Sequence, residues 1–470
     1  MAASQLLLHG YDTGHTPGRL AGYWADWDST DQVPQRAIDS RLISRFGNLD
    51  ASDGGKAGRQ SVSAECQHSS GVSSLRASGY VLRNALNLFS NFTYFLDDPD
   101  NGDQFEQAER RTTTGGRLTY RRLGHVLGNH HAESAVGIQV RRDWLSPVGL
   151  YRTVNRARLS TTREDEVGQT MIGTYAQSEI EWTRYFRSTL GGRADFYQFD
   201  VTSDQPLNSG SGSKALFSPK LSSVLGPWAG TEFYVNFGTG FHSNDARGAI
   251  THIDPCTGES VEPVTPFVRG TDGEIGLRTV RVKGLQSTLT AWYLDLDSEL
   301  LFVGDAETTE PGRPSRRLGI EWTNYWRLKP WLTADGDVAF TRARFRDADP
   351  AGDFIPGALD RVISAGVTVE PTSRVFGSVR LRHFGPRPLI EDASVESKAT
   401  TLWNGEGGIR LSGMARVVCE LYNIFDAEVS DIDYYYASRL QGEAADGIDD
   451  IHTHPALPRT IRLSLQLSFK

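Results

Sequence analysis

The chain has 470 residues, a net charge of −9, 38% hydrophobic residues and a mean hydropathy of −0.40. A single globular core rarely grows beyond about 300 residues, so this length implies either several domains or a closed barrel. No stretch approaches the roughly 18 consecutive apolar residues of a membrane-spanning helix, and the 49 Lys and Arg residues form no basic stripe. Helical membrane proteins and nucleic-acid-binding proteins are therefore excluded.

The composition favours an all-β fold. The 48 Gly, 21 Phe, 16 Tyr and 10 Trp residues are what turns and aromatic girdles require. The three cysteines, Cys66, Cys256 and Cys419, are odd in number and lack CxxC spacing, so they indicate neither a disulfide framework nor a zinc site. The segment Met1–Leu8 has no basic region followed by an apolar core, so we do not expect it to be a secretory signal.

The first 60 residues have the least regular pattern. After Pro34, the apolar residues Ile38, Leu42, Ile43 and Phe46 recur at helical spacing. We expect a short helix or an ordered loop there, lying across a barrel mouth.

An acidic segment follows at Asp97, Asp98, Asp100 and Asp103. Carboxylate oxygens are ligands for hard cations such as Ca²⁺, so these four residues form a candidate metal site. Their spacing is not that of an EF-hand, and a solvated acidic loop is the alternative that we favour.

Strict alternation of apolar and polar residues, which is typical of half-buried β-strands, recurs along the rest of the chain. The apolar positions are Val136, Ile138, Val140; Phe233, Val235, Phe237; Leu318, Ile320, Trp322; Leu332, Ala334, Gly336, Val338, Phe340; Val375, Gly377, Val379, Leu381; and Ile461, Leu463, Leu465, Leu467, Phe469. The alternate polar face carries Arg380, Arg382, Asp335 and Asp337, which we expect to neutralise each other across a polar interior.

About nineteen such segments can be counted, many near the roughly 9 to 11 residues that cross a bilayer at a tilt. Short turns alternate with long connections, an asymmetry typical of outer-membrane barrels. The short turns are Lys283-Gly284, Lys329-Pro330, Pro371-Thr372-Ser373 and Ser412-Gly413, and the long connections are 96–106, 243–269, 303–315, 346–360 and 426–458. With no tandem repeat or linker, residues 1–470 are predicted to form a single domain.

Two blocks of sequence carry a resemblance to a known family. Ser218-Pro219-Lys220-Leu221, Pro227-Trp228 and the segment 231–243 (TEFYVNFGTGFHS) resemble the mid-barrel signature of TonB-dependent receptors. Leu421-Tyr422-Asn423-Ile424-Phe425-Asp426 resembles the block near the penultimate strand of that family, and the chain closes on the aromatic Phe469. Segments 90–95, 242–248 and 431–436 are similar to those of a subgroup of these receptors.

The resemblance implies a transmembrane, antiparallel, up-and-down β-barrel of about 22 strands in the bacterial outer membrane. Its loops would be long on the extracellular side and its turns short on the periplasmic side. The family carries a signal peptide, a plug domain and a TonB-contacting box before the barrel, and nothing here matches them. We therefore expect an N-terminally truncated barrel that also lacks the first few strands, and a natural plugless barrel is the alternative. Lys470 after the final aromatic residue is a further departure.

The implied function is a receptor-transporter that takes up a scarce nutrient complex, siderophore-like or another metal or organic ligand, with energy supplied through TonB. A passive pore or a non-functional truncated fragment is the alternative. The implied partners are the small-molecule ligand, the TonB, ExbB and ExbD complex acting through the plug, the barrel-assembly machinery, and outer-membrane lipid with lipopolysaccharide. We expect a monomer without a cofactor, and not an enzyme, because GxSxG, HExxH and Walker motifs are all missing from the sequence.

Candidate ligand contacts lie in two predicted loops, because a rigid scaffold positions such loops for recognition. The first group combines an aromatic ring with polar donors and a guanidinium: Phe241, His242, Asn244, Asp245 and Arg247. Structural packing of that loop is the equal alternative. The second group is rich in tyrosine and acid: Asp431, Asp433, Tyr434, Tyr435, Tyr436 and Arg439.

Overall fold

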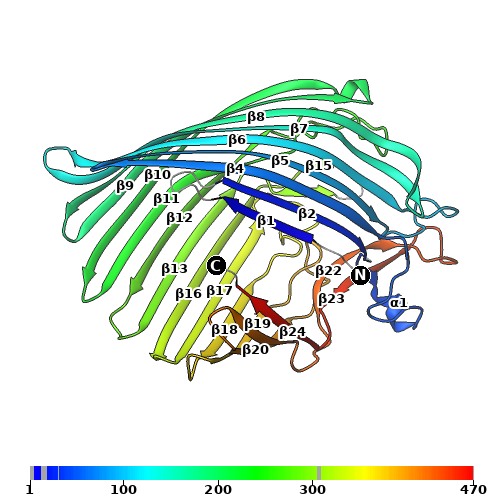
Figure 1. Cartoon of the computed structure of the whole chain (residues 1–470). Helices are drawn as coiled ribbons and strands as arrows, with labels where there is room; N and C mark the ends of the chain where they lie inside the picture. Colours follow the sequence, from blue (N-terminus) through cyan, green and yellow to red (C-terminus); the bar gives the residue numbers. More distant parts are fainter. Residues whose placement is uncertain (1–4, 12–17, 30, 304–307, 469–470) are drawn as a thin grey trace.

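The computed structural model describes residues 5–11, 18–29, 31–303 and 308–468. Its main feature is a 19-stranded antiparallel sheet that curves into a barrel wall (Figure 1). Its strands are β1 (Gln5–Tyr11), β2 (Gly18–Asp28), β4 (Gly54–Ser70), β5 (Ser73–Ser90), β6 (Phe105–Val126), β7 (His130–Val154), β8 (Ala157–Thr183), β9 (Phe186–Ser203), β10 (Gly210–Trp228), β11 (Thr231–Ser243), β12 (Phe267–Thr279), β13 (Leu285–Leu296), β16 (Ser315–Lys329), β17 (Leu332–Phe345), β18 (Arg361–Val369), β19 (Val375–Phe384), β20 (Thr400–Arg410), β21 (Ala415–Tyr422) and β24 (Thr460–Leu467). The prediction of about nineteen strands in an all-β barrel is confirmed.

Smaller elements lie in the connections. A three-stranded sheet contains β3 (Val33–Pro34), β22 (Ser430–Ser438) and β23 (Ile448–Pro455), and a hairpin contains β14 (Leu300–Val303) and β15 (Thr308–Pro311). The helical elements are α1 (Gln35–Asp39) and a 3-10 turn, η1 (Pro206–Asn208). The predicted short helix after Pro34 is therefore present. No described helix is long and apolar enough to cross a bilayer.

Each strand of the main sheet pairs with the next one along the chain, so the topology is up-and-down. Among the described residues, β1 pairs only with β2, and β24 pairs only with β21. These two edge strands are separated by eighteen antiparallel steps, so they run in the same direction. An all-antiparallel closure would need an odd number of further strands between them.

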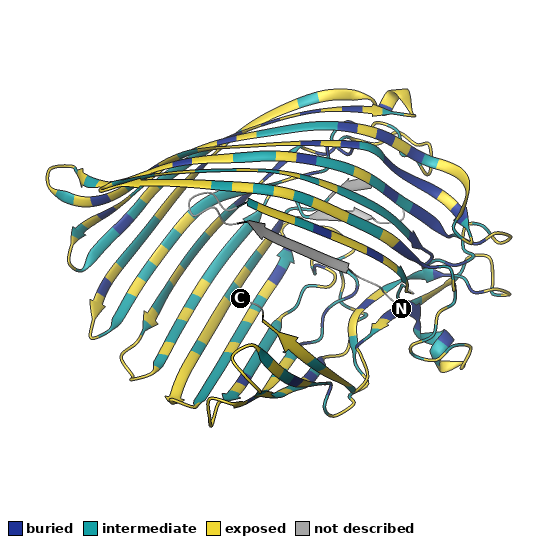
Figure 2. Cartoon of the chain, in the orientation of Figure 1, coloured by how far each residue is buried: buried dark blue, intermediate teal, exposed yellow. Residues whose placement is uncertain are grey.

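The two faces of the sheet differ in chemistry. Val62 and Val81, which are opposite each other in β4 and β5, are 57% and 48% exposed. Figure 2 shows this alternation of exposed and less exposed residues along most strands. Large apolar side chains on the outer face suit a hydrocarbon environment, and the opposite face carries most of the polar groups.

The connections at the two ends of the barrel are unequal. At one end, the turn side, the predicted turns Lys283-Gly284, Lys329-Pro330, Pro371-Thr372-Ser373 and Ser412-Gly413 each join consecutive strands. At the other end, the loop side, long segments such as 244–266, 346–360 and 423–459 join the strands. The connection between β7 and β8 is only Asn155-Arg156, but these strands have 25 and 27 residues and so extend beyond the span expected for a bilayer.

Some residues covered by the sequence predictions lie outside the described residues, and the predictions missed strands near the N-terminus. Residues 1–4 lie outside the described residues, within the segment that is not expected to be a secretory signal. Residues 304–307, within a predicted long connection, also lie outside them. So do Phe469 and Lys470 at the end of the chain. The N-terminal region, which had the least regular pattern, contributes β1 and β2 to the main sheet.

Candidate functional site

The loop side of the barrel brings both predicted groups of ligand contacts to one end of the molecule. One group lies at the end of β11 and in the following segment, residues 244–266, here called the inner loop. The other lies on β22, within the three-stranded sheet of β3, β22 and β23, here called the mouth sheet. Figure 1 shows β22, β23 and α1 beyond the ends of the barrel strands.

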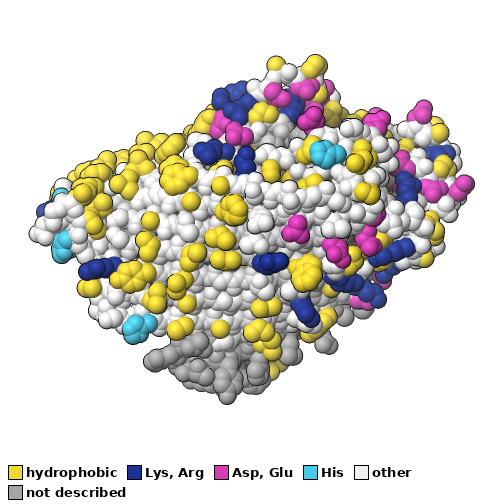
Figure 3. Space-filling model, turned by 90° about the horizontal axis from the view of Figure 1, so that it is seen from above, with side chains coloured by type: hydrophobic (Ala, Val, Ile, Leu, Met, Phe, Trp, Pro, Cys, Tyr) yellow, Lys and Arg dark blue, Asp and Glu magenta, His cyan; other side chains and the backbone are white. Residues whose placement is uncertain are grey.

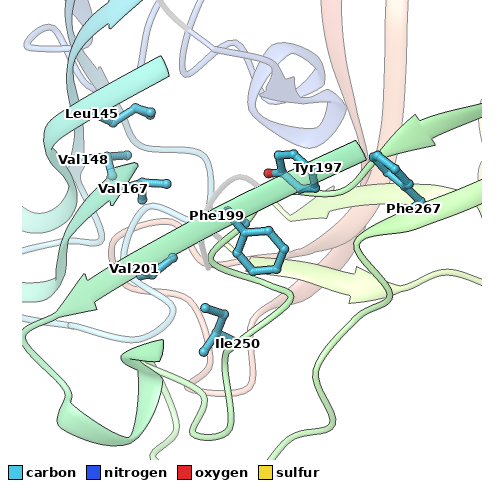
Figure 4. Close-up of a cluster of buried hydrophobic side chains, with 9 residues drawn as sticks. Leu145, Val148, Val167, Tyr197, Phe199, Val201, Ile250 and Phe267 are labelled. Carbon is cyan, nitrogen blue, oxygen red and sulfur yellow. The ribbon is translucent and has the colours of Figure 1, made fainter. Parts of the chain in front are cut away.

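The inner loop packs against the inner face of β7, β8 and β9. Tyr197, Phe199 and Val201 occupy alternate positions of β9 and are all buried. They form a cluster with residues of neighbouring strands and of the inner loop (Figure 4), namely Leu145, Val148, Val167, Ala246, Ile250 and Phe267. This stretch of the inner face is therefore apolar, and burial of the cluster holds the loop in place.

The first predicted group takes part in this packing. The ring of Phe241 lies 4.4 Å from that of Phe267, and Asn244 donates a hydrogen bond of 2.7 Å from its side-chain amide to the carbonyl of Thr265. Arg247 is buried and donates to Asp245 at 2.8 Å. Burial raises the pKa of Asp245, but the charge and hydrogen bonds of Arg247 outweigh it and hold that pKa below its usual range.

Two further observations concern the same group. The guanidinium of Arg247 also lies 4.0 Å from Asp165, which forms a buried ion pair with Arg163. On β11, Nε2 of His242 is buried and has no hydrogen-bond partner among the described residues. The structure thus uses Asn244, Asp245 and Arg247 in internal contacts, and their contact with a ligand stays a prediction.

Some members of the second predicted group make contacts within the protein, and others face solvent. Tyr436 stacks on His452 with ring centroids 3.7 Å apart, and its hydroxyl accepts a hydrogen bond of 3.0 Å from the side chain of Gln32. Arg439 donates to the carbonyls of Glu443 and Phe95 at 3.1 and 3.3 Å.

The other members of this group differ in their access to solvent. Asp433 is buried, Tyr435 is half-buried and Tyr434 is 43% exposed. Asp431 is exposed and accepts a hydrogen bond of 3.1 Å from Arg382 on β19. The accessible members are therefore Asp431 and Tyr434.

A polar network anchors the mouth sheet, and sequence reasoning did not find it. Arg36 in α1 donates to Glu443 at 2.9 Å and to the carbonyl of Ser438 at 2.9 Å, and its backbone N–H donates to Asp450 at 2.8 Å. His452 is fully buried, with Nε2 lying 2.7 Å from the hydroxyl of Ser438. Burial lowers the pKa of His452 to about 4, so the ring is neutral at neutral pH.

A second missed feature is a buried carboxyl just before β4. Asp53 is buried close to Asp50 and Asp31. Burial, and then the two neighbouring charges, raise the pKa of Asp53 to about 9. The side chain of Gln104 donates to Asp53 at 3.4 Å and to Asp50 at 3.2 Å. This carboxyl is therefore protonated at neutral pH, a state that only the three-dimensional arrangement reveals.

The predicted metal residues have a local structural role. The carboxylate of Asp103 accepts backbone hydrogen bonds of 2.8 Å from Leu96 and Asp98, and the carboxylate of Asp98 accepts two more from Asp100 and Asn101. Within the described ranges, no group of three or more His, Cys, Asp or Glu side chains is arranged to hold a metal ion. The acids Asp97, Asp98, Asp100 and Asp103 are thus not brought together around a common point.

Ion pairs line the inner face. Arg380 pairs with Asp335 at 3.0 Å, as predicted, whereas Arg382 pairs with Asp431 of the mouth sheet rather than with Asp337. An Arg-x-Asp pattern also recurs in the three neighbouring strands β7, β8 and β9, in Arg141 with Asp143, Arg163 with Asp165, and Arg193 with Asp195. The spacing of two places both side chains of each pair on one face, a signal that the sequence carries but that the sequence analysis did not use.

Comparisons with known proteins agree with this architecture. The chain is similar to the closed form of the ferric-catecholate import receptor Fiu from E. coli K12, with a TM-score of 0.71, 13% identity, and coverage of 100% of this chain and 78% of that one. It is similar to the unliganded ferric citrate transporter FecA, with a TM-score of 0.76, 14% identity, and coverage of 100% and 70%. The copper transporter OprC gives a TM-score of 0.72 at 14% identity, with coverage of 99% and 78%. At these identities the likeness shows the fold.

No curated protein matches the chain. The family model described as TonB dependent receptor-like, beta-barrel, matches residues 5–424. The family consists of receptors rather than enzymes, and its barrel is an outer-membrane protein. The chain therefore belongs to the family of TonB-dependent receptor β-barrels of the bacterial outer membrane.

Proposed function

We propose that residues 1–470 form the barrel domain of a receptor that takes up a scarce nutrient complex, siderophore-like or another metal or organic ligand, with energy supplied through TonB. The observation that carries the proposal is the family match over residues 5–424, together with a loop side covered by ordered aromatic and charged segments. The structural neighbours named for ferric-catecholate, ferric citrate and copper transport support a metal complex as the ligand class.

The mouth sheet is the part of the loop side that we assign to ligand contact. Tyr434 exposes much of its ring, and Asp431 lies at the surface beside Arg382. An aromatic ring with an adjacent carboxylate and guanidinium offers stacking and charged hydrogen bonds to a polar organic complex. The inner loop is less suited to ligand contact, because its charged groups already pair with each other.

The other proposed partners follow from the family. The TonB, ExbB and ExbD complex would act through a plug, and the barrel-assembly machinery would insert the chain into the membrane. The chain would be a monomer surrounded by lipid and lipopolysaccharide. The competing proposal is a passive pore, since a wide barrel without a plug would hold water.

Uptake of iron tests the two proposals against each other. The chain, joined to a plug domain of the family, is expressed in a strain without its own iron receptors, with and without TonB, and accumulation of ⁵⁵Fe-citrate and ⁵⁵Fe-catecholate is measured. We expect accumulation of at least one complex that requires TonB. Accumulation that is equal without TonB would support the pore and overturn the receptor.

A pair of tyrosine variants tests the assignment to the mouth sheet. Tyr434→Ala should reduce uptake about tenfold if the ring stacks on the ligand, because such a contact contributes about 1.5 kcal/mol. The matched control is Tyr120→Ala, an exposed tyrosine on the outer face of β6 near the turn side. Equal uptake by the two variants would show that Tyr434 does not contact the ligand.

A further inference from the structure

A cavity of about 440 Å³ lies between the mouth sheet, α1 and the segments 396–399 and 428–430. Asp433 of β22 and Thr453 of β23 line it from the mouth sheet. These two residues are directly opposite each other in the register, whereas Tyr434 occupies the alternate position of β22. The cavity therefore borders the face of the sheet opposite to the exposed ring of Tyr434.

Asp433 is the buried acid of this cavity. The residue is 7% exposed, and its carboxylate has no hydrogen bond or ion pair among the described residues. The hydroxyls of Ser430 and Thr453, which line the same cavity, lie 2.5 Å apart and bond each other. Buried carboxylates in proteins are normally paired or hydrogen-bonded, because an isolated buried charge is costly. The burial of Asp433 without a partner therefore points to a cationic group that enters the cavity.

Two basic side chains line the same cavity, and neither of them neutralises Asp433. The guanidinium of Arg45 lies 3.9 Å from Glu428 and donates a hydrogen bond to the carbonyl of Val429. Lys398 is exposed and takes part in no ion pair within the described part of the chain. The carboxylate of Asp433 is thus left for a cation from outside the chain.

The rest of the lining suits an organic cation with an aliphatic chain. The half-buried apolar side chains of Ile38, Val429 and Ile451 offer contact to methylene groups. The acids Asp39 and Glu396 also line the cavity and are exposed. Figure 3 shows acidic side chains gathered toward the loop-side end of the molecule, at right, and such a field favours the approach of cations. A metal ion fits less well, because no three acidic, His or Cys side chains of the described residues are arranged to hold one.

We propose that this cavity binds a small aliphatic diamine. One ammonium group, which carries three N–H donors, pairs with the carboxylate of Asp433 and the hydroxyl oxygens beside it. The carbon chain packs against the apolar side chains, and the second ammonium group meets the exposed acids Asp39 and Glu396. The volume of the cavity lies in the range of small-molecule sites, about 300–1,000 Å³. This binding depends on the folded mouth sheet and not on the ligand that the receptor carries.

Binding of 1,5-diaminopentane to the purified full-length chain in a nonionic detergent tests the proposal. Calorimetric titration at neutral pH compares it with 1,5-pentanediol, which has the same carbon chain without charge, and with CaCl₂. We expect the diamine to bind about tenfold more tightly than the diol, because a charged hydrogen bond contributes about 1.4 kcal/mol or more. The diamine should also slow amide exchange in β22 and β23. Equal binding of the diamine and the diol, or equal slowing of exchange by CaCl₂ at the same ionic strength, would overturn the proposal.

Two variants locate the site. Asp433→Asn should remove the preference for the diamine, whereas Asp449→Asn, at an exposed position of β23 outside the cavity lining, should keep it. Equal loss in both proteins would show a general attraction to the acidic surface and would overturn the assignment.

Exchange without the diamine gives a second readout. Asp433→Asn should exchange no faster in β22 and β23 than the unaltered chain, because it removes a buried charge that has no partner. Faster exchange would show that the carboxylate is already paired within the protein and would contradict the proposal. If Asp433→Asn does not fold, the comparison of the diamine and the diol on the unaltered chain still decides.

Discussion

Two segments cover the loop side of the barrel, and different forces hold them. The inner loop is fixed by a cluster of buried apolar side chains that includes Phe199, Ile250 and Phe267. The mouth sheet is fixed by Arg36, His452 and their hydrogen-bond partners, whose pairing depends on charge. Apolar burial does not change with pH, whereas buried histidines and ion pairs do. Arg247 holds the pKa of Asp245 at about 2, so the inner loop also keeps its charged pair between pH 7 and pH 5, whereas the mouth sheet is expected to respond to pH in that range.

The largest expected effect comes from the apolar cluster. Phe199 is 2% exposed, and its ring fills the space beside Gly212. Phe199→Ala should lower the free energy of unfolding by about 3–5 kcal/mol, measured by denaturant unfolding in detergent. The matched control is Phe196→Ala on the outer face of the same strand, where the ring is 44% exposed, and a similar loss in both variants would contradict the account.

Removal of Arg36 should have the next largest effect. Arg36→Ala leaves Glu443 and Asp450 without their cation, and we expect a local loss of about 2–3 kcal/mol, below the full value for a buried pair because all three side chains are partly exposed. Amide hydrogen exchange in β22 and β23 measures this loss. Arg36→Lys should restore only part of the protection, since an ammonium cannot reproduce the paired hydrogen bonds. Unchanged exchange in Arg36→Ala would show that the network does not hold the sheet.

The pH dependence of the mouth sheet comes third. The folded pKa of His452 is lowered to about 4 by burial, so its contribution is present above the unfolded value of about 6.5 and is lost as the pH falls from there toward 4. Between pH 7 and pH 5, we expect the sheet to lose about 2 kcal/mol of protection against exchange. In His452→Gln this loss should disappear, and a loss that persists would have to be assigned to other groups.

The smallest effect is expected on the wall itself. In the ion pair between Arg380 and Asp335 the arginine side chain is 54% exposed and the aspartate 18%, so solvent screens the pair, and Asp335→Asn should change the free energy of unfolding by about 1 kcal/mol or less. A loss as large as that of Phe199→Ala would mean that the inner ion pairs, and not the apolar cluster, determine the stability of this end of the barrel.

The wall could be predicted from the sequence because its signal is local. The alternation of apolar and polar residues, and the turns at Lys329-Pro330 and Ser412-Gly413, give the strands without reference to distant residues. The mouth sheet could not be predicted, because β3 pairs with β23 and Arg36 bonds residues 402–414 positions away in the chain.

The candidate site shows the same limit. The tyrosine-rich segment at 434–436 is recognisable by composition, but its division into the stacked Tyr436 and the exposed Tyr434 depends on where His452 lies. The acidic segment at 97–103 matches metal chemistry by residue type, yet Asp98 and Asp103 bind backbone N–H groups of their own loop. Residue type alone cannot distinguish these two uses of a carboxylate.

The most direct test of the difference between the two covers is hydrogen exchange of both segments in one sample. Exchange of residues 244–266 and 430–455 is followed at pH 7 and pH 5 and corrected for the intrinsic rate at each pH. We expect residues 430–455 to lose protection at pH 5 while residues 244–266 keep theirs. Equal changes in the two segments, or a loss confined to residues 244–266, would contradict it.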